Sequence, residues 1–138
     1  MVHRTAESNK AAAVRLYLET FQNHDFDVAE ELLSPGLVFH NAGREIRGHD
    51  GLRVFVEGWL TGFPDLRLTI DFLIADEDRV LLHWRGQGTH TGEFRGIPAT
   101  GRRVSASGLT LLRFSSGKIE EMWDEVAAFG ELQALTIG

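Results

Sequence analysis

The pattern of apolar residues changes near Asp65, and this change limits the possible folds more than any other feature of the sequence. Before it, apolar residues recur at the spacing of amphipathic helices in segments 7–23, 23–36 and 49–64. After it, the chain is rich in β-branched and aromatic residues and is interrupted by an acidic turn at Asp76–Asp78. Helices followed by strands are typical of an α+β domain, so we expect three N-terminal helices packed on a sheet.

The helical segments allow predictions of buried faces and helix ends. In the first segment, the apolar residues predicted to share a face are Ala11, Val14, Leu18 and Phe21. In the second, Asp27 and Glu30 have the spacing of a capping box, and Pro35 and Gly36 predict the end of the helix. In the third, the residues predicted to share a face are Leu52, Phe55, Val56 and Trp59.

The strand segments predict a sheet that is mainly antiparallel. Segment 36–48 contains two short strands around an Asn-Ala-Gly turn, and four longer strands follow in segments 66–90 and 102–126. Segment 129–138 predicts a last turn of helix. A sheet that is bent around helices can enclose an apolar pocket between the two layers. The glycines expected to help this sheet bend are Gly86, Gly88 and Gly108.

Composition excludes several classes of protein. The chain has 138 residues, which fits a single domain over residues 1–138. Its formal net charge of −6 disfavours binding to nucleic acid or to acidic membranes. It has no cysteine, and no apolar run reaches the roughly 20 residues of a membrane helix. The start of the chain lacks the apolar core of a signal peptide, so we expect a cytoplasmic location.

Two longer patterns and one short one carry a family resemblance. The run from Gly88 to Arg102 reads Gly-x-His-x-Gly-x-Phe-x-Gly-x-Pro-x-Thr-Gly-Arg. The run from Arg113 to Asp124 reads Arg-x-x-x-Gly-Lys-Ile-x-Glu-x-Trp-Asp, and Gly130 begins a Gly-x-Leu-Gln sequence near the end. Together they resemble the SnoaL-like polyketide cyclases of the nuclear-transport-factor-2-like superfamily. The likeness spans nearly the whole chain.

The resemblance implies both a fold and a chemistry. The implied fold is a cone-shaped α+β domain, in which a curved antiparallel (mixed) sheet and three N-terminal helices enclose an apolar pocket. The founding cyclases close a ring by intramolecular aldol condensation without a metal or nucleotide, and the aspartate that acts as their acid/base corresponds to Asp124. Their assisting histidine corresponds to Thr110, whose hydroxyl can still donate one hydrogen bond to a carbonyl. A second aspartate of many relatives corresponds to Ala127. We therefore expect a different substrate or an altered activity.

Strand geometry gives the expected surroundings of Asp124. Side chains alternate between the two faces of a strand, so Met122 and Val126 share the face of Asp124 and Trp123 takes the other. Apolar neighbours raise the pKa of an aspartate and make it a better base. We expect Asp124 to face the pocket, with Met122 and Trp59 among the residues that bind substrate. An exposed Asp124 paired with an arginine is the alternative.

Four further residues are candidates for substrate binding. His83 and Arg85 share one face of a strand. If this face meets the pocket, His83 could orient a carbonyl and Arg85 could hold Asp124 ionised. The alternative is that this face meets solvent or a partner chain. His90 could contact substrate or stabilise a corner of the fold. His40 and the adjacent Asn41 could line the pocket mouth or belong to a cap or turn. The histidines show no metal-binding spacing and no phosphate-binding loop opens a helix, so we expect no metal and no cofactor.

The sequence leaves two classes of function open. One is a cofactor-free enzyme acting on a small hydrophobic carbonyl compound, by aldol cyclisation or by another reaction of this fold, such as ketosteroid isomerisation or epoxide hydrolysis. The other is a non-catalytic module that binds a small molecule in the same pocket. The fold also implies a homodimer formed through the outer face of the sheet, with Trp84 or Trp123 possible on that face.

Overall fold

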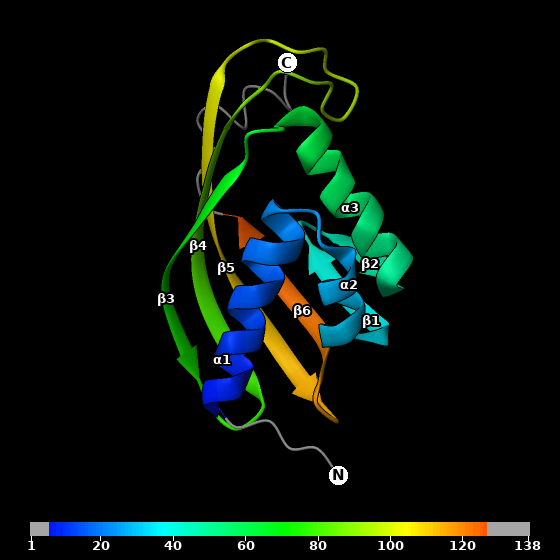
Figure 1. Cartoon of the computed structure of the whole chain (residues 1–138), viewed down its shortest axis with the longest axis vertical. Helices are drawn as coiled ribbons and strands as arrows, with labels where there is room; N and C mark the ends of the chain where they lie inside the picture. Colours follow the sequence, from blue (N-terminus) through cyan, green and yellow to red (C-terminus); the bar gives the residue numbers. More distant parts are fainter. Residues whose placement is uncertain (1–5, 127–138) are drawn as a thin grey trace.

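Residues 6–126, which the computed structural model describes, form a layer of helices in front of a curved sheet (Figure 1). The helical elements are α1 (Ala6–Arg15), the π-helical segment η1 (Leu16–Gln22) that continues it, α2 (Phe26–Leu32) and α3 (Gly48–Gly62). The strands are β1 (Leu33–Asn41), β2 (Arg44–Arg47), β3 (Arg67–Ala75), β4 (Arg79–Thr89), β5 (Arg103–Ser115) and β6 (Lys118–Val126). The predicted α+β class is confirmed, whereas the predicted helix in segment 129–138 lies outside the described residues.

The sheet is mixed and its two edges stay apart. The strand order is β2-β1-β6-β5-β4-β3. Strands β3 to β6 form an antiparallel meander, and the β1–β2 hairpin extends the sheet beyond β6. The β1–β6 pair is parallel, because the chain returns through α3 before the meander begins. This pairing places the end of β1 beside the end of β6, with Asn41 opposite Asp124.

The first helix buries a different face from the predicted one. Its buried side chains are Asn9, Ala12, Ala13, Leu16, Tyr17, Thr20 and Phe21, whereas Ala11 is exposed. The true face includes polar residues that have partners in the structure. Thr20 donates a hydrogen bond to the backbone oxygen of Asp25 at 2.7 Å, and Asn9 donates to that of Glu77 at 3.4 Å. The prediction considered only apolar residues, and it therefore placed the buried face of the helix one residue away from the observed one.

The second helix also differs from the prediction at both ends. Asp25, and not Asp27, is the N-cap, and its side chain accepts a hydrogen bond from the backbone N–H of Val28 at 3.4 Å. The helix ends at Leu32 because the next residue is already extended and begins β1. Pro35 and Gly36 therefore lie inside β1, where the register with β6 is irregular. An irregular strand segment accommodates proline because it needs no donor there.

The helix α3 and the β1–β2 turn follow the prediction more closely. Leu52 and Val56 are buried in the core, while Phe55 and Trp59 lie along the same helix and line a pocket. The predicted Asn-Ala-Gly turn joins β1 to β2, with Ala42 and Gly43 both in the left-handed region.

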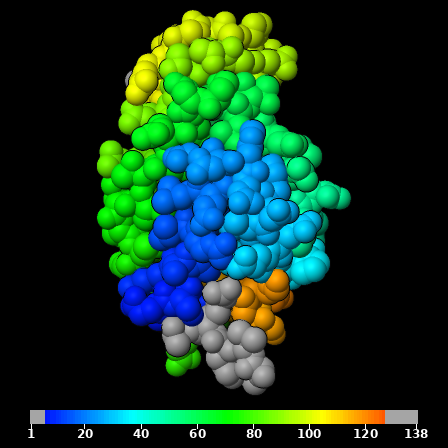
Figure 2. All heavy atoms as spheres, in the orientation of Figure 1, coloured from blue at the N-terminus to red at the C-terminus, as the bar shows by residue number. Residues whose placement is uncertain are grey.

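The glycine-rich segment between β4 and β5 packs over the end of α3 (Figure 2). The backbone N–H groups of Thr91 and Gly92 both donate to the carbonyl oxygen of Gly62, each at 3.2 Å. A Cβ atom added at Gly92 would overlap the carbonyl oxygen of Thr61, so only glycine permits this close approach. At the tip of the segment, Arg95 and the following glycine both have positive φ. Close contact with α3 and a tight turn explain the glycines of this run.

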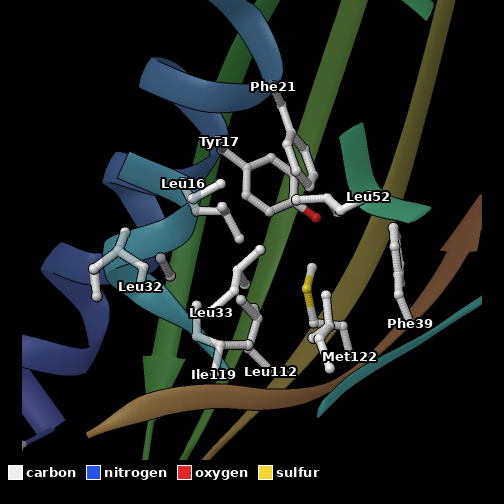
Figure 3. Close-up of a cluster of buried hydrophobic side chains, with 14 of the residues drawn as sticks. Leu16, Tyr17, Phe21, Leu32, Leu33, Phe39, Leu52, Leu112, Ile119 and Met122 are labelled. Atoms are coloured by element: carbon white, nitrogen blue, oxygen red, sulfur yellow. The ribbon is translucent and has the colours of Figure 1, made fainter. Parts of the chain in front are cut away.

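Aliphatic and aromatic side chains from both layers form one main core. Figure 3 shows Leu16, Tyr17 and Phe21 extending from the helical layer toward Leu112 and Met122 on the sheet. Over the described range, no helix is long and apolar enough to cross a membrane.

Candidate functional site

A pocket lies between the helical layer and the concave face of the sheet. Its walls come from η1, α3 and five of the strands, and it holds about 710 Å³ of unfilled space, part of which is continuous with solvent. The aromatic side chains in its walls are Tyr17, Phe21, Phe55, Trp59, Phe63 and Trp84. Among the described lining residues, Asp124 supplies the one carboxyl group.

Asp124 reaches the pocket because of its position on β6. Met122 and Asp124 are buried on the inner face of this strand, whereas Trp123 points outward and stacks on the ring of His40. Thr110 lies opposite Asp124 on β5, and Asn41 lies opposite it on β1. The predicted pocket-facing orientation of Asp124 therefore agrees with its placement, and only 8% of the residue is exposed.

Three hydrogen bonds hold the Asp124 carboxylate. Its Oδ1 atom accepts from the Thr110 hydroxyl at 3.0 Å and from the indole N–H of Trp84 at 3.2 Å. Its Oδ2 atom accepts from the amide of Asn41 at 2.8 Å. The three donors come from three different strands, so the sheet itself fixes the direction of the carboxylate.

Burial gives Asp124 the pKa of a useful base. Removal of water from the carboxylate raises the pKa of Asp124 from its usual 3.8 to about 6, and the negative charge of Glu125 acts in the same direction. Hydrogen bonds from Thr110, Trp84 and Asn41 favour the ionised form and limit the rise. The group is therefore mostly ionised at neutral pH, yet it binds a proton more readily than an exposed aspartate.

Tyr17 contacts this site through Thr110. The Tyr17 hydroxyl donates to the Thr110 hydroxyl oxygen at 2.6 Å, and the Trp84 indole N–H is 3.2 Å from the same oxygen. Burial raises the pKa of Tyr17 well above its usual value, and the negative charge of Asp124 adds to the effect. Tyr17 is therefore a permanent donor at neutral pH, and its ring also forms part of the pocket wall (Figure 3).

Three other predicted residues lie at or near this pocket. Trp59 lines it and packs against Phe94, with ring centroids 4.8 Å apart. Met122 is fully buried in the core next to the site, but it is not part of the lining. Thr110 is also fully buried, and its one proton is donated to Asp124. Thr110 is not among the residues that line the pocket, so its binding to a substrate carbonyl stays a prediction.

His83 and Arg85 lie on the other face of the sheet. The His83 ring nitrogen is 2.8 Å from a carboxylate oxygen of Asp71, and the Arg85 guanidinium donates to the same carboxylate at 2.9 Å. Neither residue belongs to the pocket lining, so Arg85 does not hold Asp124 ionised. Of the two alternatives left open by the sequence, the structure agrees with the one in which this face meets solvent or a partner.

His40 and His90 also lie away from the pocket lining. His40 is on the outer face of β1, where its Nε2 atom is 2.7 Å from a Glu121 carboxylate oxygen. His90 is fully buried at the start of the glycine-rich segment, and its Nδ1 atom accepts from the hydroxyl of Thr100 at 2.8 Å. These contacts correspond to structural roles for both residues. Across residues 6–126, no group of three His, Cys, Asp or Glu side chains is placed to hold a metal ion.

Sequence reasoning missed two residues of the site, Tyr17 and Trp84, whereas the pocket-lining alternative left open for Asn41 agrees with its placement. A usable signal existed for Trp84, because it alternates with the polar pair on β4 and the more apolar face of a strand packs inward. For Asn41 only the contact with Asp124 was not predicted, because it depends on the parallel pairing of β1 with β6. For Tyr17 the predicted buried face was shifted by one residue, so its position toward the sheet could not be seen.

Comparison with known proteins identifies the family. The profile described as SnoaL-like polyketide cyclase matches residues 11–135. The chain is 34% identical over 104 residues to the aklanonic acid methyl ester cyclase DnrD of Streptomyces peucetius, an alignment that covers 71% of this chain and 70% of DnrD. Its structure is similar to that of AclR, a proposed hydroxylase from Streptomyces galilaeus, with a TM-score of 0.83, 31% identity and coverage of 97% and 99% of the two chains. The structure of TsrD from Streptomyces laurentii matches with a TM-score of 0.77, 28% identity and coverage of 91% and 96%. The chain therefore belongs to the SnoaL-like polyketide cyclase family.

Proposed function

We propose that this protein closes a ring in a small hydrophobic carbonyl compound by an intramolecular aldol reaction, with Asp124 as acid and base. The Asp124 carboxylate takes a proton from the carbon next to one carbonyl group. The resulting enolate forms a carbon–carbon bond to a second carbonyl carbon of the same molecule, and the alkoxide product takes the proton back from Asp124. The net reaction is an isomerisation, so it needs no oxidant, reductant or second substrate.

One observation carries this proposal: a buried carboxylate at the wall of an apolar pocket, with a pKa raised to about 6 by burial. A base is most effective when its pKa lies near the working pH, because it is then ionised and still accepts protons. AclR is a proposed hydroxylase, so family membership alone does not fix the reaction. The proposal therefore depends on the carboxyl group and its surroundings.

The pocket walls support a flat, partly aromatic substrate. Aromatic rings from both layers line the pocket. The ring centroids of Trp59 and Phe63 are 5.8 Å apart along one wall. Such walls bind planar apolar molecules by burial and by ring stacking. The methyl ester of aklanonic acid is the first compound to test, because DnrD is named as its cyclase.

The test is a solvent-exchange assay in D2O. The protein is mixed with aklanonic acid methyl ester and with simpler aryl β-keto esters, and proton NMR follows deuterium entry next to the carbonyl and ring closure. We expect enzyme-dependent exchange that is lost in Asp124→Asn. Binding without exchange in both proteins would instead support the non-catalytic binding module. A ketosteroid and an epoxide in the same panel test the isomerase and hydrolase alternatives.

The activity should depend on pH through Asp124. Because the base must be ionised, kcat/KM is expected to fall about tenfold per pH unit below a midpoint near 6 and to level off above it. Rate measurements from pH 4.5 to 8.5 at constant ionic strength check this. A midpoint near the 3.8 of an ordinary aspartate would contradict the proposed environment of the group.

We also propose that the outer face of the sheet forms a homodimer. This face carries exposed apolar side chains on β3 and β5, the two strands that flank β4. They are Phe72 at 44%, Ile74 at 61% and Leu109 at 39% exposure. Trp123 lies on the same face, whereas Trp84 points into the pocket. Clustered apolar side chains of this kind mark protein contact surfaces.

Light scattering is expected to give twice the 15.4 kDa mass of one chain. Ile74→Lys should shift the protein toward a monomer, because a charge is then buried in the contact. Val54→Lys is the control, since Val54 is 71% exposed on the helical side. A wild-type mass of one chain, or equal effects of the two lysine variants, would contradict the dimer.

A further inference from the structure

Asp124 is held by a chain of two hydroxyl groups that begins at Tyr17. The Tyr17 hydroxyl donates to Thr110 at 2.6 Å, and the Thr110 hydroxyl donates to Oδ1 of Asp124 at 3.0 Å. Tyr17 and Thr110 are buried and come from η1 and β5, which are far apart in sequence. Both layers of the fold therefore contribute to the position of this one carboxylate.

The donors and acceptors leave one arrangement for the proton of Thr110. A threonine hydroxyl has one proton and two acceptor positions. Tyr17 donates to its oxygen, and the single indole N–H of Trp84 is shared between that oxygen and Oδ1 of Asp124, so both acceptor positions face a donor. Its proton is then directed to Asp124, the remaining partner. Removing Tyr17 would leave this hydroxyl free to turn.

The two carboxylate oxygens of Asp124 differ in the number of hydrogen bonds that they accept. Among residues 6–126, Oδ1 accepts from both Thr110 and Trp84, whereas Oδ2 accepts only from Asn41. A carboxylate oxygen can accept about two hydrogen bonds, so Oδ2 keeps one position for a substrate proton. Asp124 lines the pocket, and Oδ2 is its carboxylate oxygen with a free acceptor position.

We propose that Tyr17 and Thr110 are a positioning pair that fixes Asp124 through Oδ1, so that proton transfer with the substrate takes place at Oδ2. This inference rests on the proposed function of Asp124 as acid and base. The family resemblance implies a histidine at the Thr110 position, and here the hydroxyl pair supplies the contact to the carboxylate. A hydrogen bond to a carboxylate also stabilises its charged form, so the pair lowers the basicity of Asp124 as it positions it.

Few other titratable groups act on Asp124. Within the described lining of the pocket, Tyr17 is the other titratable side chain, and Glu125 acts from the neighbouring position on β6. Tyr17 stays neutral because burial raises its pKa. A change in the pKa of Asp124 on mutation of the pair can therefore be assigned to the lost hydrogen bonds.

The test measures the pKa of Asp124 directly, by ¹³C NMR of protein labelled at the aspartate side-chain carboxyl carbon. Thr110→Val keeps the shape and removes the donor, and we expect the pKa of Asp124 to rise by about one to two, from about 6. Tyr17→Phe should give a smaller rise in the same direction, and Thr110→Ser should restore a value close to that of the wild type. The control is Thr20→Val, which removes a buried hydroxyl of the same kind that bonds to the backbone of Asp25.

The outcomes separate this inference from the proposed function. If the pKa of Asp124 is the same in the wild type, Thr110→Val and Tyr17→Phe, the positioning pair is refuted, whatever the activity. If Thr20→Val shifts it as much as Thr110→Val, the effect is general loosening and the inference also fails. For variants that turn over substrate, the midpoint of the kcat/KM profile should move with the NMR value. Loss of activity in Asp124→Asn is a separate measurement and tests only the role of Asp124.

Discussion

Asp124→Asn is expected to lower kcat for ring closure or for α-proton exchange by about 10²- to 10⁴-fold. An amide cannot take a proton from carbon near neutral pH, whereas the shape of the side chain hardly changes. The apolar walls of the pocket are untouched, so ligand affinity should stay within a few fold. Stopped assays give kcat, and quenching of tryptophan fluorescence gives affinity, because Trp59 and Trp84 line the pocket.

A carboxyl group elsewhere on β6 provides the control. Glu121→Gln removes an acid on the same strand that pairs with His40 and Arg113 outside the pocket. It should leave kcat within about twofold of the wild type, since it touches no part of the site. Equal losses in Asp124→Asn and Glu121→Gln, or no loss in either, would refute the assignment of Asp124 as the base.

Asp124→Asn should also change how the free energy of unfolding depends on pH. The pKa of Asp124 is raised on folding, so its contribution to stability is fully present below the unfolded value of about 3.8 and is lost as pH rises through about 6. The shift corresponds to about 3 kcal/mol at neutral pH. Urea unfolding should therefore show Asp124→Asn gaining stability relative to the wild type between pH 4 and pH 7. If Asp124→Asn instead loses stability relative to the wild type over this pH range, the carboxylate is better solvated than its burial indicates.

The sequence was sufficient to predict the architecture and to single out Asp124 as the carboxyl group on which the proposed function rests. The helical spacing of apolar residues gives way to strand-like segments at Asp65, and glycines within those segments predict a sheet bent around a pocket. These are local properties of the chain, so they can be read without knowing the fold. The family patterns then singled out Asp124, and strand alternation placed its side chain on the face of Met122, away from Trp123.

The surroundings of Asp124 could not be predicted in the same way, because each contact joins distant segments. Asn41 reaches the carboxylate only through the parallel pairing of β1 with β6, and Tyr17 only through packing of the helix on the sheet. The outward position of His83 and Arg85 likewise depends on which face of β4 the helices cover. Alternation divides a strand into two faces, but only the tertiary fold decides which of them is inside.

Gly92→Ala is expected to destabilise the fold by about 2 to 4 kcal/mol, because its Cβ atom would overlap the backbone oxygen of Thr61, which cannot move aside like the end of a side chain. To make room, the segment must leave the end of α3, which breaks the paired hydrogen bonds to Gly62 and loosens Phe94 from Trp59 in the pocket wall. Urea unfolding at pH 7 measures the loss, and ligand affinity should fall with it. Gly58→Ala is the matched control: no atom lies within 4 Å of its added Cβ, so removing a helical glycine there should stabilise α3 by about 0.5 to 1 kcal/mol. If both variants unfold at the wild-type urea concentration, the close packing of the glycine-rich segment on α3 is not part of the folded state.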